Sequence, residues 1–147
     1  MADESEIYKQ RELDRVKIGA LPKTAMQYRG WDSANNSSLG AIDRSKDDTI
    51  TRWYLLAAEA IGDARVILNK LHENSQGMHQ LDRFVGNLMM TTTYTTDPIF
   101  GFRILSYAEW CRRQRTTPRG RVIIAMVSIR FRLDRNRGNQ KMKKEKE

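Results

Sequence analysis

The chain contains a single cysteine, Cys111, among its 147 residues. One thiol cannot form a disulfide framework within the chain, and such sparing use of cysteine suits a reducing compartment. No apolar run approaches the roughly 20 residues that span a bilayer, and the N-terminus has no signal-peptide pattern. Ala2 stands where N-myristoylation requires glycine. The sequence therefore predicts an intracellular protein, cytoplasmic or nuclear, that is neither secreted nor transmembrane.

Motifs that hold phosphates, metals or nucleic acid are also missing. The glycines follow neither phosphate-loop spacing, GxGxxG or GxxxxGK[ST]. His72 and His79 have no companion cysteines at zinc-ligand spacing. There is no RNP-type aromatic signature, no GXXG loop and no heptad zipper after the basic region. We therefore predict no metal site, no cofactor and no small-molecule substrate.

Two weak candidates for catalysis remain. Cys111 lies beside Arg112, whose charge favours a thiolate nucleophile. Glu59 and Asp63 lie one helical turn apart and could form an acid/base pair. A half-buried cysteine at a helix end and acids on a solvated helix face explain these residues more simply, so we predict that the protein is not an enzyme and has no catalytic residue.

Positive charge is what the chain has in excess, and it is distributed unevenly. Residues 1–100 carry 12 Lys and Arg against 14 Asp and Glu, whereas residues 101–147 carry 14 against 4. The net charge of +8 therefore comes from the last third of the chain. This asymmetry predicts a polyanionic partner, nucleic acid first and an anionic membrane surface second. A solvated basic tail is the plainer alternative.

Most of these cations are arginines that lie in or near apolar segments. The planar guanidinium donates two parallel hydrogen bonds to a phosphate, whereas a tail that only aids solubility is usually built from lysine and glutamate. The predicted nucleic-acid contacts are Arg112, Arg113, Arg115, Arg119, Arg121, Arg130, Arg132, Arg135 and Arg137.

Apolar periodicity predicts a mainly helical body. Apolar residues recur at three- and four-residue steps over 48–73, which predicts one long helix, and further helices are expected at 77–90 and 98–114. A short, highly charged helix is expected at 4–17. Residues 19–46 are rich in glycine, serine and asparagine, which predicts a long loop.

The stretch 121–133 is interpreted as a strand, with a helix as the alternative. From Ile123 to Leu133 its odd positions are all apolar, and its even positions change from apolar to Ser128, Arg130 and Arg132. A lone strand is not stable, so it needs a partner within the chain or in a second subunit. The expected fold is α+β and mainly helical: one globular domain at 1–133, followed by a disordered basic tail at 134–147.

These observations predict a small basic protein that binds nucleic acid. RNA is favoured because no helix for reading a DNA groove is recognisable. A viral nucleocapsid or accessory protein, or a ribonucleoprotein subunit, would have this composition. The alternative is an assembly, adaptor or matrix-type protein whose helices bind a protein partner or an anionic membrane surface. Exposed helical or strand surface also predicts a homodimer.

Overall fold

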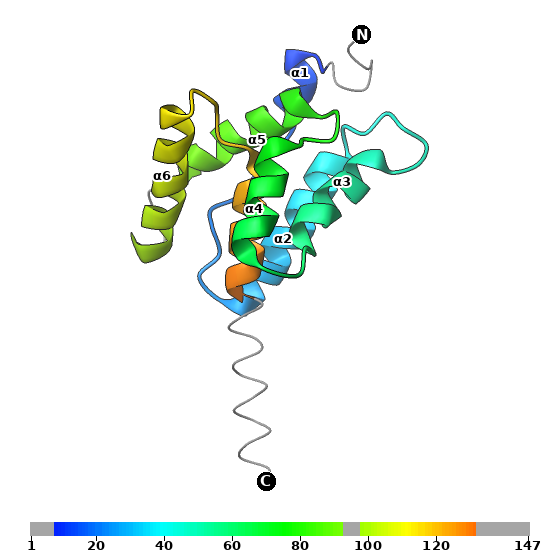
Figure 1. The fold of residues 1–147 in the computed structure, drawn as a ribbon. Helices are drawn as coiled ribbons and strands as arrows, with labels where there is room; N and C mark the ends of the chain where they lie inside the picture. Colours follow the sequence, from blue (N-terminus) through cyan, green and yellow to red (C-terminus); the bar gives the residue numbers. More distant parts are fainter. Residues whose placement is uncertain (1–7, 93–97, 132–147) are drawn as a thin grey trace.

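The structure, a computed structural model, describes residues 8–92 and 98–131 and is built from helices (Figure 1). The labelled helices are α1 (Gln10–Leu13), α2 (Ala25–Gly40), α3 (Thr49–Ala58), α4 (Ala64–Glu73), α5 (His79–Thr92) and α6 (Pro98–Arg113). A further helix, which we call the central helix, covers residues 120–131. In Figure 1 this helix, in orange, passes behind α4, with α6 on one side and α2 and α3 on the other. Over the described ranges, no helix is both long and apolar enough to cross a membrane.

The prediction of an α+β fold with a strand at 121–133 is wrong. Residues 121–131 are helical, and no strand occurs in residues 8–92 and 98–131. The helix is buried on almost every side, since Val122, Ile123, Ile124 and Ala125 are at most 1% exposed. A helix enclosed in this way is apolar all round and has no polar face to reveal its period. A short apolar run of this kind cannot be told from a strand by periodicity alone.

The long loop predicted at 19–46 contains helix α2. The Thr24 side chain accepts a hydrogen bond from the backbone N–H of Gln27 at 3.1 Å and caps the start of this helix. Its buried residues, Trp31, Asn35 and Leu39, recur every four positions. The periodicity escapes notice because one of the three buried positions is an asparagine.

The single helix predicted at 48–73 is divided into α3 and α4. Asp63 caps α4 by accepting the backbone N–H of Arg65 at 2.9 Å, and Gly62 before it has a φ of 129°. A glycine reaches this backbone conformation at little cost, so the chain reverses direction here. Ile61 fits the apolar repeat but is 90% exposed. It therefore extends the pattern across the break without contributing to the core.

The remaining predicted elements agree with the structure to different degrees. The helices expected at 77–90 and 98–114 correspond to α5 and α6. The helix expected at 4–17 is reduced to the four residues of α1, and residues 1–7 lie outside the described ranges. The predicted basic tail at 134–147 also lies outside the described residues.

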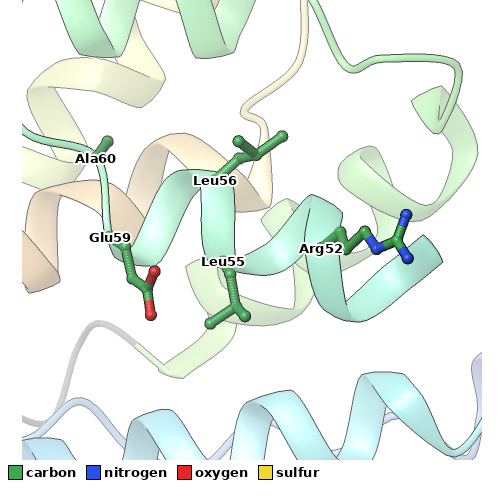
Figure 2. Close-up of a pocket in the computed structure, with 5 residues that line it drawn as sticks. All are labelled: Arg52, Leu55, Leu56, Glu59 and Ala60. Atoms are coloured by element: carbon green, nitrogen blue, oxygen red, sulfur yellow. The ribbon is translucent and has the colours of Figure 1, made fainter. Parts of the chain in front are cut away.

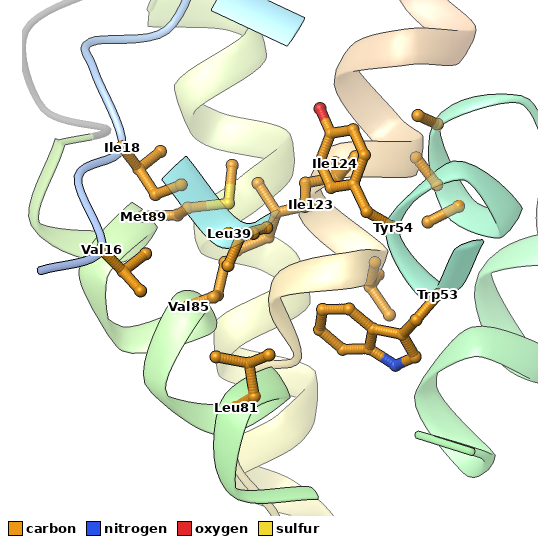
Figure 3. Close-up of a cluster of buried hydrophobic side chains, with 14 of the residues drawn as sticks. Val16, Ile18, Leu39, Trp53, Tyr54, Leu81, Val85, Met89, Ile123 and Ile124 are labelled. Atoms are coloured by element: carbon orange, nitrogen blue, oxygen red, sulfur yellow. The ribbon is translucent and has the colours of Figure 1, made fainter. Parts of the chain in front are cut away.

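The apolar core surrounds the 120–131 helix. This helix contributes Ile123 and Ile124 to the core, and α2, α3 and α5 contribute further buried side chains (Figure 3). Val16 and Ile18, which precede α2 without regular secondary structure, lie beside Val85 and Met89 of α5 in Figure 3. The core is therefore assembled from elements far apart in the sequence.

A buried hydrogen-bond network holds the start of the 120–131 helix. The Asp82 carboxylate of α5 accepts the backbone N–H of Arg121 at 2.9 Å and the Ser75 hydroxyl at 2.8 Å. The Arg121 guanidinium donates to the carbonyl oxygens of Trp53 at 3.2 Å and Asn74 at 3.1 Å. It also lies 5.1 Å from the centre of the Trp53 ring. Four segments of the chain therefore meet at this network.

The same helix start is in backbone contact with α5. A Cβ atom added at Gly86 would overlap the carbonyl oxygen of Pro118, and one added at Gly120 would overlap the side chain of Val85. Only glycine allows the two backbones to approach this closely. The position of the central helix therefore depends on both glycines.

We predict opposite effects of alanine at two helical glycines. Gly86→Ala should lower the free energy of unfolding by about 2 kcal/mol, because backbone atoms must move to admit the methyl group. Gly30→Ala in α2, where no atom lies within 4 Å of the added Cβ, should raise it by about 0.5 kcal/mol. Urea unfolding of the two variants measures both changes. Equal stability of the two variants would contradict the close backbone contact.

Candidate nucleic-acid interface

The structure divides the predicted arginines into three groups. Arg112, Arg113 and Arg115 are exposed at the C-terminal end of α6 and in the turn after it. Arg119 and Arg121 are buried, and Arg130 is half-buried with its guanidinium 5.4 Å from the centre of the Phe131 ring. The other three lie outside the described residues: Arg132, Arg135 and Arg137. The single arginine surface expected from the sequence is thus not formed by the six described arginines.

The two buried arginines contact protein atoms. The backbone N–H of Arg119 donates to the Tyr107 hydroxyl at 3.0 Å, and its guanidinium donates to the hydroxyls of Thr117 at 2.7 Å and Thr116 at 3.4 Å. Arg121 occupies the core network described above. Burial lowers the pKa of Arg121, and the charge of Asp82 opposes that effect. The structure therefore gives these two residues a role in packing.

The three exposed arginines are grouped by the way α6 ends. The backbone N–H of Arg115 bonds to the Arg112 carbonyl at 3.1 Å, and that of Thr116 bonds to the Cys111 carbonyl at 2.9 Å. These two bonds form a Schellman motif. Arg115 takes its left-handed position with a φ of 57°, where glycine is usual. We call Arg112, Arg113 and Arg115 the basic end of α6.

A cluster of aromatic side chains lies next to the basic end of α6. The His72 ring of α4 is edge-on to Tyr107 and Trp110 of α6, with ring centres 5.7 and 4.9 Å away. The Tyr107 hydroxyl and His72 Nδ1 are 2.7 Å apart. Burial, followed by the charge of Arg119, lowers the pKa of His72. Burial therefore favours the neutral form of the imidazole, whose Nδ1 is hydrogen-bonded to the Tyr107 hydroxyl.

These rings border a cavity of about 230 Å³ between α4, α6 and the central helix. The lining residues, which together we call the aromatic pocket, are Arg65, Leu68, Asn69, His72, Tyr107, Trp110, Val122 and Met126. Trp110 is 36% exposed. The pocket therefore offers an accessible aromatic surface.

A second hollow lies along α3 on another part of the surface. It is an open depression of about 570 Å³ lined by Arg52, Leu55, Leu56, Glu59 and Ala60, which we call the α3 strip. Figure 2 shows Arg52 and Glu59 at opposite ends of this stretch, with the two leucines between them. Leu56 is 53% exposed. The strip is therefore apolar at its centre and carries one charge of each sign at its ends.

The two candidates for catalysis find little support in the geometry. Cys111 is buried, and burial raises the pKa of its thiol. Glu59 belongs to the α3 strip, and Asp63 caps α4. In the described ranges, no three His, Cys, Asp or Glu side chains lie together where they could hold a metal ion. The exposed surfaces are thus the stronger candidates for function.

No family model, curated protein or solved structure matches this chain. The basic end of α6, the aromatic pocket and the α3 strip are therefore the features from which a function is inferred.

Sequence reasoning missed the pocket residues of α4. Arg65, Leu68, Asn69 and His72 recur at three- and four-residue steps, so they share one helix face. The partner face on α6 lies more than 30 positions away in the sequence, and nothing in either segment indicates that they pair. In the sequence, His72 is considered only as a possible zinc ligand, although it shares a helix face with Arg65, Leu68 and Asn69.

We predict that Arg115→Gly stabilises the fold. The free energy of unfolding should rise by roughly 0.5–1 kcal/mol, because glycine relieves the left-handed strain at the Schellman position. Arg115→Ala is the control, since it removes the same guanidinium but keeps a Cβ in the strained conformation. Thermal or urea unfolding distinguishes the two. Equal stability of the glycine and alanine variants would show that the backbone at this residue is not strained.

Proposed function

We propose that this protein binds nucleic acid through its phosphate backbone, with the basic end of α6 as the main described contact. Arg112, Arg113 and Arg115 are exposed, and none forms an ion pair with another described residue. Their guanidinium groups are therefore available to a ligand. Arginine donors suit phosphate because each planar group can bond two oxygens at once.

The local charge supports this proposal. Residues 98–131 contain seven arginines and one acidic residue, Glu109. Two of the arginines are buried, and the nearby charge of Asp82 opposes theirs, so the exposed arginines supply most of the positive potential. Helix α6 ends with the negative end of its dipole at Arg112 and Arg113, which stabilises both cations there. A polyanion approaching this end meets concentrated positive charge.

The conformation of Arg115 is the observation that carries the proposal. A non-glycine residue in the left-handed region costs stability, and such outliers often occur at functional positions. Asp48 and Gln76 share this left-handed conformation, but of the three only Arg115 carries a cation, and it occupies a position where a glycine would close α6 equally well. We infer that its charge is used for binding.

RNA is the favoured polyanion. Binding of this kind is driven by release of counterions from phosphates and carries little sequence information. The sequence has no motif for reading a DNA groove. Contacts at Arg132, Arg135 and Arg137, and a role in a viral nucleoprotein or ribonucleoprotein, stay predictions from the sequence.

A second candidate function, self-assembly, is favoured by the α3 strip. Arg52 and Glu59 are seven residues apart, about two helical turns, and therefore lie on one face. Neither forms an ion pair with a described residue. If two copies pack α3 antiparallel about a two-fold axis, each Arg52 faces the Glu59 of the other copy. The leucines between them then form an apolar centre, as at many homodimer interfaces.

We predict that the double variant Arg112→Glu/Arg113→Glu binds a short single-stranded RNA at least about 10-fold more weakly at 100 mM salt. The slope of log affinity against log salt should also fall by about 1.5, since each neutralised phosphate of a single strand contributes about 0.7. Fluorescence anisotropy at several salt concentrations measures both quantities.

The matched control is Lys23→Glu/Arg29→Glu, which changes the net charge equally at exposed positions on or beside α2. It should lower the affinity much less. Equal loss in both double variants would reduce the effect to net charge and contradict a site on α6. Retention on anionic vesicles without any RNA binding would favour the membrane-surface alternative.

We predict that a charge exchange on the α3 strip separates assembly from nucleic-acid binding. Arg52→Glu or Glu59→Arg alone should weaken dimerisation at least about 10-fold, because each places two like charges face to face. The double exchange Arg52→Glu/Glu59→Arg should restore the dimer, because opposite charges meet again. Sedimentation velocity over a range of concentrations measures the dissociation constant. A monomeric wild-type protein, or single variants that dimerise like it, would exclude this interface.

A further inference from the structure

The aromatic pocket contains the one tryptophan of the described residues that solvent reaches readily. Trp31 and Trp53 are 7% and 2% exposed, whereas Trp110 is 36% exposed at the pocket mouth. Arg113 follows Trp110 by three residues, which is about 4.5 Å along the helix axis. A chain whose phosphate lies on the basic end of α6 is therefore close to the Trp110 ring.

The pocket lining has the chemistry of a site for a flat, partly polar ring. Trp110, Tyr107 and His72 provide aromatic surface, and Leu68 adds an apolar contact. The exposed Asn69 carries an amide that can both donate and accept hydrogen bonds, as the edge of a nucleobase requires.

The charge of the lining selects against cations. No acidic residue lines the pocket, and Arg65 contributes a positive charge to it. An aromatic cage that binds a methylated amine favours its cation with nearby carboxylates. This pocket has no carboxylate in its lining, and Arg65 would repel a cation. A ligand that joins an aromatic ring to a phosphate is instead complementary to both the rings and the guanidinium.

The pocket is also held in shape before any ligand arrives. The Tyr107 hydroxyl accepts the backbone N–H of Arg119 at 3.0 Å and is hydrogen-bonded to His72 Nδ1 at 2.7 Å, so the two rings are fixed relative to the segment that leads into the 120–131 helix. The rings of Tyr107 and Trp110 are inclined by only 20°, with centres 6.3 Å apart. A prepared site loses less free energy to ordering when the ligand binds.

From these observations we propose that the aromatic pocket binds one unpaired nucleobase of a single-stranded nucleic acid, stacked on Trp110. The inference rests on the proposed nucleic-acid function and adds a binding mode to it. A volume of about 230 Å³ lies below the range of about 300–1,000 Å³ typical of drug-sized ligands, which suits a single ring system. A paired base is inaccessible to such a site, so the protein should prefer single strands to duplexes.

The experiment compares two ten-nucleotide ligands, one of adenosines and one with the same ribose-phosphate backbone but no bases. Wild-type protein should bind the base-containing strand about 10-fold more tightly than the abasic strand, in keeping with one stacked base. Its tryptophan fluorescence should be quenched by the first ligand only. Trp110→Ala should remove both the preference and the quenching, whereas Trp110→Phe should keep most of the preference.

Phe102→Ala is the matched control. Phe102 is a 70% exposed aromatic residue on the same helix and does not line the pocket. Its removal should leave the preference unchanged. Circular dichroism of all three variants verifies that the helical content is retained.

The outcomes separate the two proposals. If wild-type protein binds both ligands equally, phosphate binding stands and the base site is overturned. If the preference survives in Trp110→Ala or is lost equally in Phe102→Ala, the base binds elsewhere and the proposal is again overturned. If neither strand binds, the proposed nucleic-acid function itself fails.

Discussion

The carboxylate of Asp82 and the main chain of Arg121 form the interaction on which the rest of the structure depends. Asp82 accepts the backbone N–H of Arg121, which lies in the first turn of the helix, where N–H groups have no partner within the helix itself. Burial raises the pKa of Asp82, and the hydrogen bond from Arg121 opposes that effect. Loss of the Asp82 side chain would leave the backbone N–H of Arg121 and the Ser75 hydroxyl buried without this acceptor, which is destabilising. The carbonyl groups of Trp53 and Asn74 complete the network, so α3, α5 and the central helix are fixed together.

This interaction also explains why the arginine-rich stretch contains both buried and exposed arginines. Arg121 is buried because its guanidinium donates to the carbonyl oxygens of Trp53 and Asn74 and its N–H to Asp82. Arg112 and Arg113 instead lie in the last turn of a surface helix. The sequence allows the second placement to be predicted, since the helix at 98–114 and its basic last turn are recognisable. It does not allow the first, because the partners of Arg121 come from positions 39 to 68 residues away.

The same limit applies to the fold and to the pocket. α5 and α6 follow from apolar spacing, which is a local signal. The central helix does not, because its enclosure by other helices erases the polar face that makes a helical period visible. The aromatic pocket brings α4 to α6, and pairing of distant helix faces depends on packing that no single segment encodes. Exposure of Trp110 follows from that packing.

The enclosed position of the 120–131 helix bears on how the protein is made. A ribosome releases α1 to α6 first, so their inward faces emerge before the helix that fills the space between them. Until then Leu81, Val85 and Met89 lack the contacts that bury them, and the nascent chain exposes apolar surface. Folding of this domain is therefore completed only after its last described helix has left the exit tunnel, and chaperones have a period in which to bind.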